Sequence, residues 1–210
     1  MRISKWMIGL IVLSVIGTGL IYPYLPAHVP SHWNISGEID DYQPKLFVFF
    51  TALLPFLIYM MMIFLPKIDP KRDAYQKHQK AYQATATILA IFLIFIHWIT
   101  LMAALGYPVD VGMMVRLGVA VLFVVLGNYL SQVRQNYFFG IKTPWTLANE
   151  QVWKKTHRMG GYVFVLLGIL TGVTAFFNNQ AAFFVMIGGL IIGVAFIFVY
   201  SYVIYKKIAG

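Results

Sequence analysis

Six long apolar segments dominate this sequence and limit what it can fold into. A helix needs about 20 predominantly apolar residues to cross the hydrocarbon core of a bilayer. The segments that meet or approach this length are residues 6–24, 46–65, 85–105, 113–130, 161–177 and 182–205. Because 60% of the residues are hydrophobic and 11% are charged, a soluble domain of this size would leave much apolar surface uncovered. The sequence therefore predicts an all-α integral membrane protein with six transmembrane helices.

The basic residues predict how these helices are oriented. If the helices alternate in direction, all of the 16 Lys and Arg residues except Lys45 and Arg116 fall on one side of the membrane. Since Lys and Arg are enriched in cytoplasmic loops, both termini are predicted to be cytoplasmic. Arg2 and Lys5 precede the first apolar segment as in a signal peptide. That segment is long and lacks an A-x-A cleavage site, so we expect a retained anchor and a multi-pass membrane protein.

We expect two structural units. Residues 1–84 would form an N-terminal two-helix unit with an extracytoplasmic loop at 25–45 and a basic cytoplasmic loop at its end. Residues 85–210 would form a four-helix unit. Its cytoplasmic loop, residues 127–161, is named the signature loop below. The enrichment of Lys and Arg in cytoplasmic loops accounts for the net charge of +9, so no direct contact with nucleic acid is expected.

The signature loop holds the densest set of specific polar side chains in the chain, in the sequence GNYLSQVRQNYFFGIKTPWTLANEQVWKKTHRMGG. Asn149 suits the N-cap of a helix that starts at Glu150. Trp153 and His157 follow Glu150 at i+3 and i+7, so the three share one helical face. We expect a short interfacial helix, with Trp145 and Trp153 at the depth of the lipid headgroups and basic residues facing anionic lipid.

We assign the polar and aromatic residues of this loop to a functional surface: Asn128, Arg134, Asn136, Thr143, Pro144, Trp145, Thr146, Glu150, Trp153, Thr156 and His157. Two interpretations stay open, because such residues contact a partner or hold the loop's own fold through hydrogen bonds. As a further alternative, Glu150 and His157 would serve as an acid and a base at the membrane face.

The signature loop also resembles the signature of the SdpI family, membrane immunity proteins against a secreted bacterial toxin of the cannibalism type. The shared elements are G-N, R-x-N-x-x-x-G, T-P-W-T-L, V-W-x-x-T-H-R and G-G, found here at 127–128, 134–140, 143–147, 152–158 and 160–161. Lys142 departs from this pattern, since members often carry Arg there, and Lys lacks the planar fork for a bidentate contact. The resemblance implies protection from a secreted toxin peptide and capture of a cognate cytoplasmic repressor at the membrane.

The first outer loop reads LPAHVPSHWNISGEIDDYQPK, and its prolines exclude a regular helix. It resembles a short domain of unknown function that often precedes the SdpI domain, with matches at Pro26, Pro30, His32, Trp33, Asn34, Gly37 and Asp40. We take the last five of these as outer-loop recognition residues.

A metal site in this outer loop is the alternative to a hydrogen-bonded cap. The i, i+4 spacing of His28 and His32 suits zinc on a helix, and nearby carboxylates could join them. Because Pro30 lies between the two histidines and breaks such a helix, we predict no metal. We expect a cap that packs Trp33 on the membrane surface.

Few ionisable residues lie within the apolar segments, and each is a functional candidate by its depth. His97 lies midway along the third segment, where function and a hydrogen bond to a neighbouring helix both remain open. Arg116 is expected to reach outward to the interface or to pair with Asp110. The small-residue motifs at 168–172 and 189–193 suit close helix packing within the chain, or a dimer contact.

The basic loop before the third segment is interpreted as a solvated helical extension. Asp73 and Lys77 are spaced for an i, i+4 ion pair, and Tyr75 and Tyr82 are expected at the membrane interface. His78 is given no special role.

The resemblance implies an immunity protein whose partners are a toxin peptide and a cytoplasmic repressor. The sequence itself predicts contact with the lipid bilayer, no enzymatic activity and no cofactor. It has no Cys, no Gly-rich phosphate loop, no H-E-x-x-H and no G-x-S-x-G. The rival functions are a small transporter, and a membrane enzyme that uses Glu150 and His157 or the His and Asp residues of the outer loop.

Overall fold

The computed structural model describes residues 4–177 and 179–209, so Arg2, which entered the charge argument, lies outside the described residues. In this part of the chain, the long helices are α1 (Lys5–Ile21), α2 (Phe47–Ile68), α4 (Gln79–Ala104), α5 (Val111–Leu130), α7 (Glu150–Thr174) and α8 (Asn179–Ala209). The short elements are η1 (Tyr22–Tyr24), α3 (Ala74–Lys77) and α6 (Pro144–Ala148).

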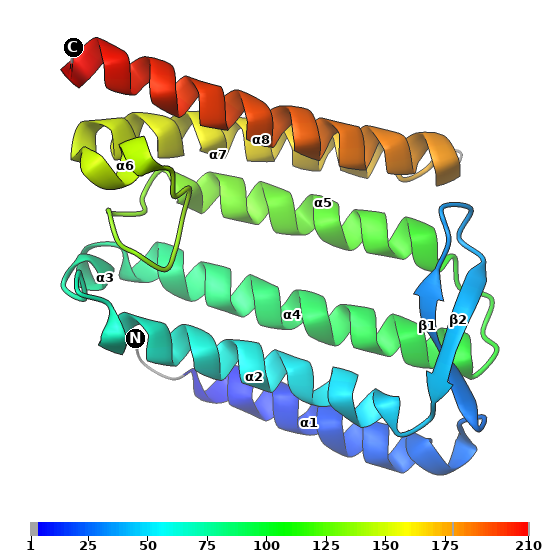
Figure 1. Ribbon diagram of the computed structural model, residues 1–210. Coiled ribbons are helices and arrows are strands. Elements are labelled where there is room, and N and C mark those ends of the chain that lie inside the picture. The colour runs from blue at the N-terminus through cyan, green and yellow to red at the C-terminus, as the bar shows by residue number, and fades with distance from the viewer. Residues whose placement is uncertain (1–3, 178, 210) are drawn as a thin grey trace.

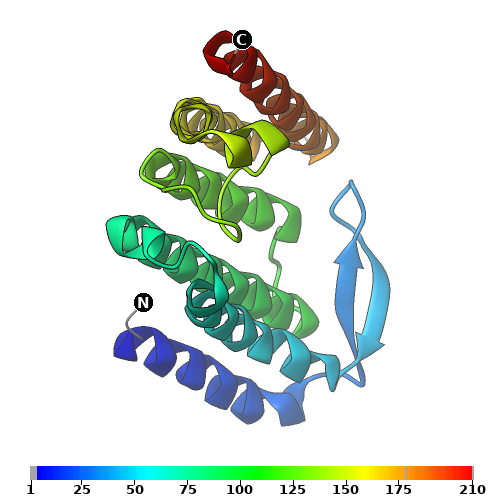
Figure 2. The ribbon, with the colours of Figure 1, turned by 60° about the vertical axis from the view of Figure 1, so that its left-hand side comes forward.

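The long helices lie side by side, each antiparallel to the one before it (Figure 1). Figure 2 shows them as one stack from α1 to α8 rather than as a closed ring. Helix α4 packs against α2 on one side and α5 on the other, and α7 packs against both α5 and α8. The start of α1 and the end of α8 lie at the end of the stack that also carries α3 and α6, which we name the loop end. The opposite end carries a β-hairpin and is named the hairpin end.

The prediction of a helical membrane protein is confirmed. By length and composition, α1, α2, α4, α5 and α8 can each cross a membrane. Among the described residues, α7 does not meet the same criterion, because its first turns carry charged side chains and its apolar stretch begins near Gly161. Large apolar side chains such as Leu20 and Ile192 stay exposed on the helices, as expected of faces that lipid covers.

Residues 28–44 form a β-hairpin that the all-α prediction did not include. Strand β1 (His28–Trp33) pairs antiparallel with β2 (Ile39–Pro44), with irregular register near His32. The prolines exclude a helix here, as predicted, and the turn requires Gly37, which has a φ of 82°. At the base of the hairpin, Val29 is buried with apolar side chains from α2 and α4.

Close helix packing explains several glycines of the apolar segments. A Cβ at Gly127 would lie 2.7 Å from the carbonyl oxygen of Gly161, and one at Gly168 would lie 2.8 Å from an α5 carbonyl oxygen. The backbones of α5 and α7 therefore touch where no side chain fits. In the second small-residue motif, at 189–193, the glycines face Leu167 of α7. Both predicted motifs thus pack within the chain.

His97 links three helices through hydrogen bonds. The side chain is buried, with Nε2 lying 2.8 Å from the Thr18 hydroxyl of α1 and Nδ1 lying 2.9 Å from the Thr51 hydroxyl of α2. This geometry gives His97 of α4 the hydrogen-bonding role that the sequence analysis left open beside a functional one.

Candidate functional site

Asn136 organises the first half of the signature loop. Its side chain is fully buried, and Oδ1 accepts hydrogen bonds from the backbone N–H groups of Phe138 (3.0 Å) and Phe139 (2.7 Å). Nδ2 donates to the carbonyl oxygens of Arg134 (2.8 Å) and Phe139 (2.9 Å). A side chain thus supplies the partners that a helix or sheet would otherwise give to this irregular backbone.

The basic loop after α2 docks onto this turn. Asp69 is buried, and its carboxylate accepts hydrogen bonds from the backbone N–H groups of Lys71 (2.7 Å) and Tyr137 (3.0 Å). The Tyr75 hydroxyl lies 2.8 Å from Asp69 Oδ2 and 3.0 Å from Asn136 Oδ1. Burial, and then the hydrogen bond to Asp69, raises the pKa of Tyr75, so the hydroxyl stays a donor. The two loops therefore share one buried hydrogen-bond network.

His78 makes a second link between the two loops. It is buried, and its Nδ1 accepts a hydrogen bond from the backbone N–H of Arg134 (3.1 Å). Burial, and then the charge of Arg134, lowers the pKa of His78 to about 4, so the ring is neutral at pH 7. Because Tyr75, His78 and Tyr82 are all buried, the prediction of a solvated extension with interfacial tyrosines is wrong.

His157 ties the second half of the signature loop to the first. It is fully buried; Nε2 accepts a hydrogen bond from the N–H of Ile141 (2.9 Å), and Nδ1 donates to the carbonyl oxygen of Trp153 (2.9 Å). One donor and one acceptor suit the neutral ring, and burial lowers the pKa of His157 to about 4. Gly140 has a φ of 115°, and a Cβ there would overlap Nε2 of His157. Gly140 therefore lets the loop backbone pack closely against the ring of His157.

The prediction of a short interfacial helix is wrong. Helix α7 runs unbroken from Glu150 to Thr174, with the Asn149 side chain capping it by accepting hydrogen bonds from two backbone N–H groups, as predicted. Trp153 does not face lipid headgroups, because it is fully buried, stacks on His157 and donates to the carbonyl oxygen of Val133 (2.8 Å). Trp145 is half-buried and packs against two aromatic side chains of α8.

The threonines of the signature loop are also buried. Thr143 and Thr146 cap α6 reciprocally, and the Thr143 hydroxyl lies 3.1 Å from that of Ser201 in α8. Pro144 is exposed in the first turn of α6. Thr156 is fully buried, and its hydroxyl has no hydrogen-bond partner within residues 4–177 and 179–209. Most of the predicted site residues are therefore buried and hold the loop's own fold.

A smaller set of the predicted residues is exposed, namely Asn128, Arg134, Pro144 and Glu150. Asn128 donates to the carbonyl oxygen of Val124 in its own helix (2.9 Å). Glu150 forms an exposed ion pair with Lys154 (2.9 Å), which lowers the pKa of the carboxyl group. Glu150 thus points to solvent and His157 is enclosed, so the structure does not bring the two together as an acid–base pair.

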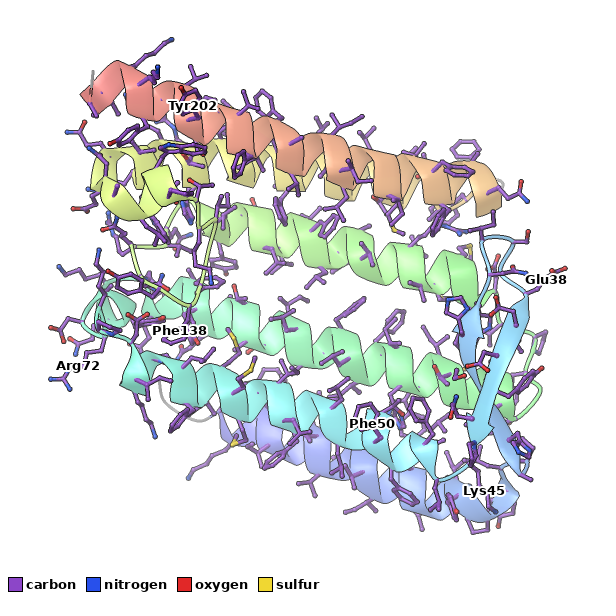
Figure 3. The ribbon with its side chains drawn as sticks, in the orientation of Figure 1. Glu38, Lys45, Phe50, Arg72, Phe138 and Tyr202 are labelled. Atoms are coloured by element: carbon purple, nitrogen blue, oxygen red, sulfur yellow. The ribbon has the colours of Figure 1, made fainter. Side chains whose placement is uncertain are left out.

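Two members of the exposed set, Arg134 and Glu150, meet the basic loop in a groove of about 290 Å³ at the loop end. Its lining includes Lys71, Lys77 and Arg134, together with Asp73 and Glu150. In the described part of the chain, the ion pairs join His32 to Asp40 and Glu150 to Lys154, so the predicted pair of Asp73 with Lys77 does not form. Figure 3 shows the neighbouring Arg72 and Phe138 at this end of the molecule.

Sequence reasoning missed the residues through which the basic loop holds the signature loop. They are Asp69, Tyr75, His78 and Gln135; the amide of Gln135 bonds Lys71 and the backbone of α6. The available signal was weak. Several polar residues followed an apolar helix, and nothing in their spacing indicated a remote partner.

At the hairpin end, most of the predicted recognition residues shape the hairpin itself. Asn34 Oδ1 accepts hydrogen bonds from the backbone N–H groups of Ser36 (2.9 Å) and Glu38 (3.1 Å). His32 Nδ1 lies 2.6 Å from Asp40 across the strands, and both side chains are exposed. Among the described residues, no group of three or more His, Cys, Asp or Glu side chains could hold a metal ion. Trp33 is half-buried and lines a cavity above α5 and α8.

Comparison with known proteins finds two matching family models and one similar curated protein. Residues 132–201, from the signature loop into α8, match the SdpI/YfhL protein family. Residues 9–59 match a domain of unknown function (DUF1648), so both resemblances seen in the sequence are confirmed. The chain is also 28% identical over 201 residues to "Immunity protein SdpI" of Bacillus subtilis (strain 168), covering 96% of this chain and 95% of that relative. No solved structure matches the chain.

Proposed function

We propose that this protein is a membrane immunity protein that protects the cell from a secreted peptide toxin. The similarity along 96% of the chain to a protein named for immunity carries this proposal. A transporter would need polar groups along a path through the membrane. His97, the ionisable group midway along the third predicted segment, is instead enclosed by threonines of two neighbouring helices.

The proposal includes six membrane-spanning helices with both termini in the cytoplasm. Helix α7 lies alongside α5 and α8 (Figure 1), so it would occupy the same slab of the bilayer although its first turns are charged. The basic residues cluster toward the loop end, which would face the cytoplasm. Reporter fusions after Asp40 and after Asn149 should report outside and inside respectively, and the reverse result would contradict this topology. The division into units at 1–84 and 85–210 stays a prediction.

The structure divides the functional surface into two sets with different expected roles. The buried residues, among them Asn136, Trp153 and His157, would hold the loop in shape. The exposed Arg134 and Glu150 would contact a partner at the groove of the loop end. Substitution of the first set would therefore lower the amount of folded protein, whereas substitution of the second would remove function from a folded protein.

Survival of a toxin-sensitive strain tests the proposal. Cells that express the protein should survive culture supernatant from a toxin producer, and Arg134→Ala should lose this protection at unchanged membrane levels. Lys155→Ala is the matched control, because Lys155 is an exposed basic residue in α7 outside that groove. If no strain is protected by the wild-type protein, or if Lys155→Ala is as damaging as Arg134→Ala, the proposed role of the exposed set fails.

A second proposed role is capture of a cytoplasmic repressor, which the family resemblance implies. The observation that favours it is the mixed-charge groove at the loop end, formed by two loops from separate parts of the chain. A promoter reporter for the protein's own gene should respond to toxin with the wild-type protein and fail to respond with Lys77→Ala. Full response in that variant would argue against repressor contact at the groove.

A further inference from the structure

A cavity of about 260 Å³ lies between the hairpin and helices α5 and α8. Its walls are mainly apolar, with Trp33 and Ile35 from the hairpin, Val115 from α5, and Phe183 and Met186 from α8. Gln180 near the start of α8 donates to the Ser36 hydroxyl at the hairpin turn (3.2 Å), so the turn is linked to α8.

Arg116 lines this apolar cavity. Its side chain is 5% exposed, and Nη2 lies 3.4 Å from the carbonyl oxygen of Ala175. Its expected reach toward the interface stays a prediction. The predicted partner Asp110 caps α5 by accepting from the N–H of Met113 (2.8 Å), and its charge also acts on Arg116. A guanidinium keeps its charge even when buried, so it makes this cavity a cationic site within apolar walls.

We propose that this cavity binds the anchor of a secreted peptide, a large apolar side chain next to a C-terminal carboxylate. The carboxylate would accept hydrogen bonds from the planar fork of Arg116, a geometry that suits bidentate recognition. The apolar side chain would pack between Trp33 and Phe183. This inference rests on the proposed function, since it names the part of the toxin that the hairpin end would recognise.

The composition and size of the cavity favour a peptide over a lipid. Aromatic residues, Met and Arg are the types enriched at the centres of protein interfaces, and Trp33, Met186 and Arg116 provide them here. The volume lies below the roughly 300 Å³ of the smallest drug-sized sites, so it suits one anchor rather than a whole ligand.

Binding of two short peptides to the purified protein tests the inference. The probes are N-acetyl-Gly-Gly-Leu-Phe with a free C-terminal carboxylate and the same peptide with a C-terminal amide, titrated calorimetrically into the full chain in phosphatidylcholine nanodiscs. We expect the carboxylate peptide to bind at least tenfold more tightly. Arg116→Gln should remove this preference and Arg116→Lys should retain part of it. Val115→Phe, which fills the cavity, should weaken both peptides.

Several results would overturn the inference. They are equal binding of the two peptides, binding unchanged by Arg116→Gln, no binding of either peptide, or displacement by phosphatidylglycerol, which would assign the cavity to lipid. The survival assay separates this inference from the proposed function. If the wild-type protein binds the carboxylate peptide but protects no strain, the proposed function fails and the cavity stands. If Arg116→Gln loses peptide binding but still protects, the toxin does not bind at this cavity.

Discussion

Asn34 at the hairpin end and Asn136 at the loop end perform the same local task in opposite surroundings. Each side-chain oxygen accepts hydrogen bonds from two backbone N–H groups of the turn that follows. Asn34 lies in a turn that water reaches, whereas Asn136 is fully buried and also bonds Tyr75 of the basic loop. The comparison shows that burial and a remote partner, rather than the turn motif, separate a local cap from a tertiary junction.

Alanine at these two positions should give the largest difference. Asn136→Ala would leave several buried backbone groups without partners, so we expect a loss of about 4 kcal/mol in unfolding free energy. Asn34→Ala should lose about 1 kcal/mol, because water can replace its bonds. Thermal unfolding in detergent measures both. Equal losses would mean that the loop end is as accessible to water as the hairpin.

The buried histidines of the loop end should make the stability of the protein depend on pH. His78 and His157 are buried with pKa values of about 4, below the ordinary value of 6.5 that the unfolded chain would show. Below pH 6.5 the unfolded state therefore binds protons that the native state does not. Stability should be fully present above pH 6.5 and fall as the pH drops toward 4, by roughly 3 kcal/mol for each histidine.

Unfolding midpoints between pH 4 and 8 test this expectation. His78→Asn keeps an acceptor for the Arg134 N–H and should flatten the profile. A profile that His78→Asn does not alter would show that this ring titrates freely in the folded protein.

Two glycines of positive φ provide the next comparison. Gly140 and Gly106 have φ values of 115° and 81°, so alanine strains the backbone at both. A Cβ at Gly140 would also meet the ring of His157, whereas nothing lies within 4 Å of a Cβ at Gly106. We expect losses of about 2 kcal/mol for Gly140→Ala and about 1 kcal/mol for Gly106→Ala in the unfolding free energy. Equal losses would mean that His157 moves aside without a cost.

The smallest expected effect concerns the Glu150–Lys154 ion pair. Both side chains are more than half exposed, so a double-mutant cycle with Glu150→Gln and Lys154→Met should give about 0.5 kcal/mol or less. A coupling energy above about 1.5 kcal/mol would mean that this ion pair stabilises the loop as strongly as a buried interaction does. Glu150 would then act with the buried residues that hold the loop in shape, rather than with the exposed residues.

Local sequence information predicted the helices well, because their boundaries depend on neighbouring residues. The apolar segments found in the sequence overlap α1, α2, α4, α5, α7 and α8, although α7 begins at Glu150 rather than at Gly161, and the N-cap at Asn149 is present. Pro30 correctly excluded a helix in the outer loop. The pairing of β1 with β2 was not predicted, since it depends on contacts between residues that are not adjacent in the chain.

In the signature loop, local spacing predicted which residues share a helical face but not which of them are buried. The i, i+3 and i+7 spacing of Glu150, Trp153 and His157 was read correctly from the sequence. Which of these side chains would be buried could not be inferred from that spacing, because the answer depends on what packs against the helix. Trp153 and His157 are enclosed by residues 133–141, and Glu150 faces solvent.

The sequence by itself determined that this is a helical membrane protein with a family signature between two apolar segments. Apolar length, charge placement and motif order are properties of the chain alone. The tertiary structure decided that Asp69, Tyr75 and His78 form the hydrogen-bond network that holds the signature loop. It also decided that Arg116 lines a cavity beneath the hairpin. The physical reason is that a polar side chain's role depends on whether water or a remote segment satisfies it, and folding settles that choice.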